Sequence, residues 1–316
     1  MKLERLVIVC AIALAVPVFG TFAQEAKPQY GAWGFDSAGA DTATKPGDDF
    51  FRYANGSWLD KTAIPADKPG YSLRLAMTDK VEQRLHDLME GAAAQAEHEP
   101  KTLDGKVGAF YKSFMDESRI ESVGVKAIAA QLDAVRKAKN RDELAALMGR
   151  VNVDFEGSLF GLTTEVDLKD PKKYAVYVGQ AGLGLPDRDY YLKSDFAKQK
   201  AAYNSYVATL LGLVGWNSPD KAARDVVAFE TKVAEASWTK AQQRDINAIY
   251  NPMAIADLGK FAAGFAWQAF LKQAQLDNLQ RIIVAEKSAF PKLTTVYAAT
   301  PLDTLKAWQA ARIADN

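Results

Sequence analysis

The sequence predicts a mainly α-helical protein that carries one small antiparallel β-hairpin. Apolar residues recur at steps of three or four along most of the chain, which is the spacing of helices with one buried face. Alternation of apolar and polar residues, typical of a strand, marks the stretch at 160–168. The composition is 48% hydrophobic and 25% charged, which is ordinary for a globular protein and excludes a disordered or low-complexity chain.

The first residues have the pattern of a secretory signal peptide. A short basic segment precedes an apolar run at 6–19, and small residues follow it up to Ala23. The run is shorter than the roughly 20 residues that a transmembrane helix needs, and Pro17 interrupts it. We therefore predict a signal peptide over 1–23, a flexible leader over 24–44, and an exported protein, periplasmic or extracellular, without a stable membrane span.

Composition also limits the chemistry and the partners. Lys and Arg total 39, and Asp and Glu total 39, so the chain lacks the basic excess that favours binding to nucleic acids. The only cysteine, Cys10, lies in the predicted signal peptide and leaves none for a disulfide in the exported chain. Two histidines sharply limit any histidine-based metal site or catalytic triad.

The first half of the folded region is expected to be helical. Asp48 is the expected N-cap of a helix through Leu59, because a carboxylate suits the positive end of a helix. Asn140 and Glu143 resemble a capping box that opens a short helix, and Gly149 is expected to end it. Between them, three apolar faces predict three helices: Leu73, Met77, Val81, Leu85 and Leu88; Leu103, Val107, Phe110, Tyr111 and Phe114; and Val125, Ile128, Leu132 and Val135.

A change of period marks the hairpin. The alternating stretch at 160–168 predicts a strand, the polar segment at 169–173 a turn, and the apolar, partly β-branched segment at 174–178 a second strand. Glycines and Pro186 then break the chain at 182–186. A further short strand is possible at 281–286.

Helices resume after this break. One is expected around 196–214, and another after Ser218, which would cap it with Pro219 at the first helical position. A helix starting at Ser288 and a last one with Asp303 as its capping-box acid complete the pattern. The aromatic-rich stretch at 261–270 is expected to lie in the core.

The last helical face runs almost to the end of the sequence without a closing signal. Leu302, Leu305, Trp308 and Ile313 share this face, and no Gly, Pro or basic last turn follows. The pattern alone leaves two interpretations open: a C-terminal helix that frays, or a polypeptide cut inside a longer protein.

Few residues have the spacing that catalysis or metal binding requires. Neither His86 nor His98 has a second histidine four residues later, so the H-E-x-x-H pattern of zinc proteases does not occur. We predict a solvated helix face at His86 and a surface position at His98. The acidic pair at 48–49 suits a helix start, and the pair that flanks Arg188 suits a local ion-pair corner. We therefore assign no catalytic, substrate-binding or metal-ligating residue.

Three segments nevertheless resemble one family. In order along the chain they are Lys45–Leu59 with Ile64-Pro65, then Gly182–Leu192 with the sequence GLGLPDRDYYL, then Tyr250–Met253 with Thr300-Pro301-Leu302. Together they resemble the N-terminal region of the neprilysin-like zinc metallopeptidases, which include endothelin-converting enzymes and bacterial secreted oligopeptidases. The resemblance covers residue 45 to the end and implies that 45–316 is the helical, substrate-enclosing domain of such an enzyme.

The resemblance implies a two-lobed architecture that is incomplete here. In the family, the N-terminal part supplies most of a helical lobe that roofs the active site and limits entry to small peptides, and it lends a hairpin to the catalytic lobe. The catalytic half carries the H-E-x-x-H motif and binds zinc. These residues are not in the sequence, so the resemblance implies a chain that ends before the catalytic domain and is inactive alone.

Two departures from the family pattern bear on substrate and disulfide residues. Gly47 and Asn55 stand where disulfide-bonded relatives have cysteines, which fits a cysteine-poor bacterial subgroup. Gly70 stands where some animal relatives have a substrate-binding arginine, and Arg74 is not at a matching position, so no substrate residue is carried over.

The sequence therefore leaves alternative functions. The first is the N-terminal portion of an exported zinc metalloendopeptidase, whose partners would be small peptides and the catalytic domain of the same polypeptide. The alternative is a stand-alone helical module that binds peptides or acts as an inhibitor, without catalysis. A third is an interaction scaffold of the cell envelope with no affinity for short peptides.

Overall fold

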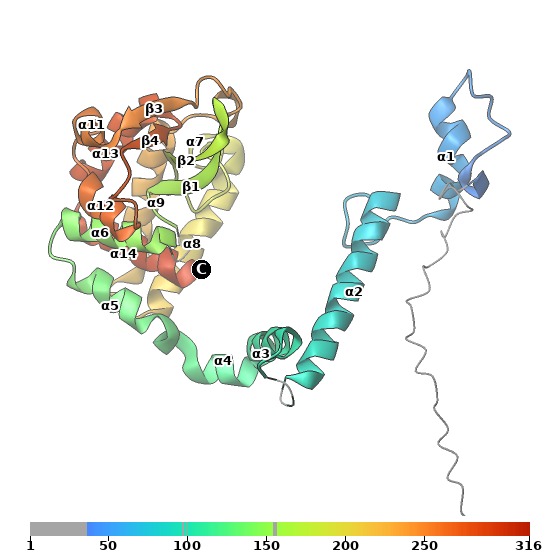
Figure 1. Cartoon of the computed structure of the whole chain (residues 1–316), viewed down its shortest axis with the longest axis horizontal. Helices are drawn as coiled ribbons and strands as arrows, with labels where there is room; N and C mark the ends of the chain where they lie inside the picture. Colours follow the sequence, from blue (N-terminus) through green and yellow to red (C-terminus); the bar gives the residue numbers. More distant parts are fainter. Residues whose placement is uncertain (1–36, 97, 99, 154–156) are drawn as a thin grey trace, which may run out of the picture. The chain divides into compact units, whose positions relative to one another are not determined.

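The computed structural model describes residues 37–96, 98, 100–153 and 157–316, and helices dominate these residues as predicted (Figure 1). The predicted signal peptide and most of the predicted leader lie outside the described residues. Two compact units follow each other along the chain, one ending at Met115 and the other beginning at Asp116, and each is described by itself. No helix in the described ranges is both long and apolar enough to cross a membrane.

The N-terminal unit consists of helices. A 3-10 turn, η1, precedes the first of them, and the bounds are η1 (Ser37–Gly39), α1 (Phe50–Lys61), α2 (Leu73–Gln95) and α3 (Leu103–Met115). The N-cap of α1 is Asp49 and not Asp48 as predicted, because an Asp49 side-chain oxygen accepts the Arg52 N–H at 2.8 Å. Arg52 also holds Asp60 through both Nη atoms and Asp41 through Nε.

Helices α2 and α3 pack closely against each other in this unit. An ideal Cβ on Gly108 would lie 2.1 Å from the Ala92 carbonyl oxygen, so only glycine permits the approach of the two backbones. The predicted helices are confirmed, but their apolar faces stay exposed: Val81 is 52% exposed and Phe110 is 76% exposed.

The C-terminal unit contains most of the helices and the whole sheet. Its helices before the hairpin are α4 (Glu117–Val123), η2 (Gly124–Ile128), α5 (Ala129–Lys137) and α6 (Arg141–Val153). Between the hairpin and the next strand lie α7 (Asp189–Leu192), η3 (Ser194–Phe196), α8 (Ala197–Leu213), α9 (Pro219–Ala236) and α10 (Lys240–Gln243). The remaining helices are α11 (Ile255–Phe261), α12 (Trp267–Gln273), η4 (Lys287–Ala289), α13 (Phe290–Ala299) and α14 (Leu302–Asp315).

The predicted hairpin is the start of a mixed sheet. Strands β1 (Phe160–Asp167) and β2 (Asp170–Gln180) pair antiparallel, with a turn shorter than predicted. The possible strand near 281 is β4 (Arg281–Val284), which runs parallel to β2, and β3 (Asn251–Ala254) pairs antiparallel with β4. The strand order in the described residues is β1-β2-β4-β3. The prediction missed β3, because four residues that include a proline carry too little periodicity to read as a strand.

The core of this unit lies between the sheet and the surrounding helices. Aliphatic residues make up most of it, and an aromatic cluster lies within it, in which Phe160 contacts the rings of Phe265, Trp267 and Phe290 at 4.5 to 5.0 Å between centroids. The expectation that the aromatic stretch at 261–270 is core is confirmed by the burial of Phe265, Trp267 and Phe270.

Two predicted helix boundaries and two predicted capping contacts are wrong, although α9 begins at Pro219 as predicted. Helix α6 continues through Gly149 to Val153, and the run from Val125 is a 3-10 turn before α5 begins at Ala129. Ser218 has a φ of 52° and makes no capping hydrogen bond, and α14 has no side-chain cap, so Asp303 closes no capping box. The 3-10 turn begins at Gly124, whose φ of 49° cannot continue an α-helix.

Candidate functional site

The segment Gly182–Leu192 is held in place by a buried carboxylate from α9. The Tyr191 hydroxyl accepts the N–H groups of Gly184 and Leu185 at 3.1 and 2.9 Å, and it donates to Glu230 Oε2 at 2.8 Å. Tyr203 Oη and Trp308 Nε1 donate to the other oxygen of Glu230 at 3.2 and 3.0 Å. The loop is thereby fixed to α8, α9 and α14 at one point.

Gly184 is required in this loop by a close contact. An ideal Cβ at this position would lie 1.8 Å from the Tyr203 hydroxyl oxygen, so any larger residue would displace that hydroxyl from Glu230. The glycine therefore belongs to the network and does not only mark a chain break.

Glu230 has an unusual protonation equilibrium for a glutamate. Its side chain is completely buried, and burial raises its pKa from 4.5 to about 7, although the hydroxyl of Tyr191 and the charge of Arg312 act in the opposite direction. The three donors match the ionised form, because a carboxylate only accepts hydrogen bonds. Burial also raises the pKa of Tyr191 and of Tyr203, which keeps both hydroxyls protonated as donors.

The segment Tyr250–Met253 fixes the far end of the hairpin. Tyr250 Oη donates to Asp167 Oδ1 at 2.7 Å, and Arg281 Nη2 on β4 lies 2.6 Å from Asp167 Oδ2. The side-chain amide of Asn251 donates to the Val284 carbonyl at 3.0 Å. Hydrogen bonds from the Lys169 N–H and from Tyr250 lower the pKa of Asp167 to about 2, and Arg281 adds to this effect. This segment therefore joins the hairpin to the rest of the sheet.

Replacing Asp167 with asparagine should lower the stability of the chain. The neutral amide of asparagine weakens the contact with Arg281. It also places N–H groups near Tyr250 and Lys169, which donate hydrogen bonds to Asp167. Because the folded pKa lies below the ordinary value of 3.8, the carboxylate stabilises the fold above about pH 4, and this contribution is lost as the pH falls towards 2. Urea unfolding should therefore show a variant deficit that is constant above pH 4 and shrinks below it. Asp170→Asn is the control, because it removes the same charge at a more exposed position in the turn. If its deficit equalled that of Asp167→Asn, the stabilising role assigned to Asp167 would be wrong.

The histidines and acidic pairs singled out in the sequence do not come together. His86 is solvent-facing on α2, 3.8 Å from Glu90, and His98 is exposed, as predicted for both. The predicted ion-pair corner at Arg188 is wrong. Arg188 Nε donates to the Ala234 carbonyl, and Asp189 pairs with Lys193, because the turn into α7 directs these side chains to different partners.

Glu230 was missed because its partners are distant in sequence. Tyr191 is 39 residues away and Trp308 is 78 residues away. One signal was available: Glu230 lies on the apolar face of α9, between Val226 and Val233. A charged residue on the buried side of an amphipathic helix requires buried donors.

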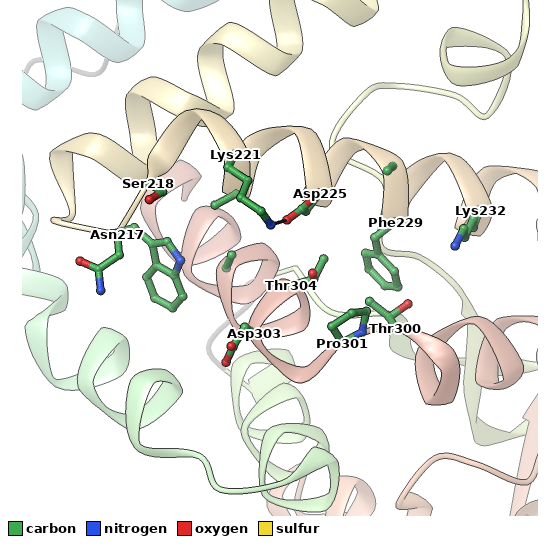
Figure 2. A pocket seen from close by; sticks show the side chains of 14 residues that line it. Asn217, Ser218, Lys221, Asp225, Phe229, Lys232, Thr300, Pro301, Asp303 and Thr304 are labelled. Carbon is green, nitrogen blue, oxygen red and sulfur yellow. Dashed lines mark hydrogen bonds and ion pairs between the residues drawn. The ribbon is translucent and has the colours of Figure 1, made fainter.

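Several cavities lie in the C-terminal unit. One, about 500 Å³, lies between α9 and the N-terminal part of α14 (Figure 2). Figure 2 shows Lys221 reaching Asp225 on α9, where the Nζ and Oδ2 atoms are 2.6 Å apart, with Asp303 and Thr304 contributed by α14. A second cavity, about 310 Å³, adjoins the Gly182–Leu192 segment.

The described residues do not fit a zinc centre. They contain no group of three His, Cys, Asp or Glu side chains placed to hold a metal ion. The buried carboxylates are engaged otherwise: Glu230 accepts from two tyrosines and a tryptophan, and Asp167 pairs with Arg281.

Comparisons with known proteins point to one family. Residues 46–316 match the N-terminal model of peptidase family M13. Endothelin-converting enzyme-like 1 of Rattus norvegicus is 27% identical over 291 residues, which cover 84% of this chain and 36% of that protein. Endothelin-converting enzyme 1 of Rattus norvegicus is 25% identical over 289 residues, which cover 86% of this chain and 37% of that protein.

Solved structures agree with this match. The zinc metalloprotease Zmp1 of Mycobacterium tuberculosis, in complex with an inhibitor, superposes with a TM-score of 0.78 at 30% identity, over 89% of this chain and 43% of that one. PepO of Lactobacillus rhamnosis HN001 shares the fold, with a TM-score of 0.64 at 18% identity over 86% of this chain and 43% of that one. The chain thus spans less than half the length of these relatives. By the family match over 46–316, which includes the three segments above except Lys45, it belongs to peptidase family M13.

Proposed function

We propose that this chain is the N-terminal portion of an exported zinc metalloendopeptidase that cleaves small peptides. In this proposal the chain encloses the active-site cavity and limits the size of the substrate, while zinc and the catalytic residues belong to another part of the polypeptide. The observation that carries the proposal is the family match over 46–316, together with the fact that the aligned part covers only 36% of endothelin-converting enzyme-like 1. The chain by itself is then inactive.

Exposed apolar faces in both units support the proposal. On α2, Met77 is 59% and Leu88 is 68% exposed, and on α3 Phe114 is 69% exposed. In the hairpin, Val166 and Tyr174 are cross-strand partners and are 46% and 76% exposed. Contiguous apolar surface of this kind usually marks an interaction site. We assign these faces to contact with the remaining part of the enzyme.

The test compares the 316-residue chain with a polypeptide extended by the coding sequence that follows Asn316. The extended polypeptide should bind one zinc ion per molecule and cleave short peptides, and the 316-residue chain should do neither. Stoichiometric zinc and turnover in the 316-residue chain would refute the proposal. Peptide binding without cleavage, in a gene with no catalytic motif downstream, would favour the stand-alone module instead.

The same pair of polypeptides tests the contact surface. The 316-residue chain should bind a hydrophobic dye, and replacing Val81 and Leu85 with serine should reduce that binding. In the extended polypeptide the same replacements should lower stability, because the two side chains would then be buried. Glu82→Ser, an exposed neighbour on α2, is the control and should change neither signal.

A further inference from the structure

The cavity beside the Gly182–Leu192 segment has an excess of hydrogen-bond donors. Three cationic side chains line it: Arg188, Lys240 and Arg312. Arginine and lysine side chains only donate hydrogen bonds, and arginine keeps its charge at any physiological pH. These three side chains therefore require hydrogen-bond acceptors, either from the surrounding residues or from a ligand.

Arg312, near the end of α14, is the side chain that most clearly lacks hydrogen-bond acceptors. Its side chain is 17% exposed, and its Nε is fully buried without a hydrogen-bond partner among the described residues. Its ion pair with Asp315 is long, at 3.6 Å. The guanidinium lies against the backbone at Gly157, where an ideal Cβ would come within 2.4 Å of Nη2. The glycine therefore provides the space that this side chain occupies. A buried donor without an acceptor is costly, so an acceptor from a ligand would be favourable.

Unlike Arg312, the other two cations have no carboxylate partner in the described part of the chain. Arg188 uses Nε on the Ala234 carbonyl, and neither it nor Lys240 has a further ion pair there. Lys240 is exposed at the start of α10, on the rim of the cavity.

The nearby carboxylates are already engaged. Asp187, also in the lining, accepts the Asp189 N–H at 2.8 Å. Glu286 accepts from the Gln180 N–H and from Gln243 Nε2, and Glu230 accepts from its three donors. One buried acceptor nearby, Gln309 Oε1, also has no partner among the described residues, but it is neutral, whereas the carboxylates that could balance the charge of Arg312 already accept other hydrogen bonds. A ligand that brings only acceptors matches this imbalance.

We propose that this cavity binds a carboxylate group of a peptide-sized ligand, with Arg312, Arg188 and Lys240 as its donors. The volume of about 310 Å³ suits one acidic side chain with its flanking backbone and is at the small end of ligand pockets. Glycines at 157, 161 and 182 in the lining allow the ligand to approach the backbone. The proposal is independent of the proposed function, since it uses only the residues of this cavity.

Calorimetry on the 316-residue chain tests this site with a matched pair of probes. The probes are N-acetylglutamate N-methylamide and N-acetylglutamine N-methylamide, which differ only in the carboxylate. The glutamate probe should bind one to one and at least about tenfold more tightly, as expected for charge-assisted hydrogen bonds. Added salt should weaken its binding.

Variants identify the donors. Arg312→Gln should weaken binding of the glutamate probe about tenfold, and Lys240→Gln, an exposed position that leaves folding intact, should weaken it by a smaller factor. Lys198→Gln, exposed on α8 and outside the cavity, is the control and should have no effect. No binding of the glutamate probe, equal affinity for both probes, or unchanged affinity in both cavity variants would overturn the proposal.

Discussion

Replacing Glu230 with alanine should lower the free energy of unfolding by about 4 kcal/mol, because it leaves three buried donors without an acceptor. These donors are Tyr191 Oη, Tyr203 Oη and Trp308 Nε1. Loss of the Tyr191 contact should also release the loop, so the Gly184 and Leu185 amides should exchange with solvent faster. Urea denaturation and hydrogen exchange measure the two effects. Glu235→Ala, exposed on the same helix, is the matched control and should change stability by less than about 0.5 kcal/mol.

The conservative variant Glu230→Gln separates hydrogen bonding from charge. The folded pKa of Glu230, about 7, lies above the ordinary 4.5, so the folded chain holds this proton more tightly than the unfolded chain. The contribution of Glu230 to the free energy of unfolding is therefore largest below pH 4.5. It falls by on the order of 3 kcal/mol as the pH rises to about 7. Glutamine does not titrate, so the deficit of Glu230→Gln should be larger at pH 5 than at pH 8. A deficit independent of pH would contradict the raised pKa.

Local patterns were sufficient to predict most of the elements. The spacing of apolar residues located α2, α3 and α8, and the alternation that starts at Phe160 located the hairpin, because both signals are repeated over many residues. Asn140 and Glu143 were placed correctly at the start of α6, where the Asn140 side chain accepts the Glu143 N–H at 2.9 Å. Such capping contacts join neighbours in sequence and can therefore be seen in it.

Contacts between distant residues were not predictable in this way. The segment Gly182–Leu192 was noticed through its resemblance to a family, but nothing in its letters shows that Tyr191 needs Glu230 or that Gly184 faces Tyr203. The exposure of the α2 and α3 faces was also unpredictable, since periodicity gives the apolar side of a helix but not what covers it. Gly149 shows a third limit of the sequence. A glycine near the end of a predicted helix can either terminate the helix or allow another backbone to approach, and the sequence does not distinguish the two roles.

Gly149→Ala should destabilise the C-terminal unit by about 2–3 kcal/mol, the range of overpacking in a close-packed interface. Helix α6 crosses α12 at this point, and an ideal Cβ on Gly149 would lie 2.0 Å from the carbonyl oxygen of Phe270 and 2.8 Å from its carbonyl carbon. The obstacle is backbone and not a flexible side chain, so the helices must move apart, and Phe270 and its buried neighbours would lose packing contacts. The midpoint of urea unfolding measures this loss.

Gly212→Ala is the matched control for this steric effect. Gly212 lies inside helix α8, and an ideal Cβ there would meet nothing within 4 Å. Alanine is a better helix former than glycine, so this variant should be more stable than the wild type by roughly 0.5–1 kcal/mol. The same replacement in two helices of one unit should thus have opposite signs. If Gly149→Ala also stabilised the chain, Gly149 would act only through helix propensity and the close crossing of α6 and α12 would be wrong.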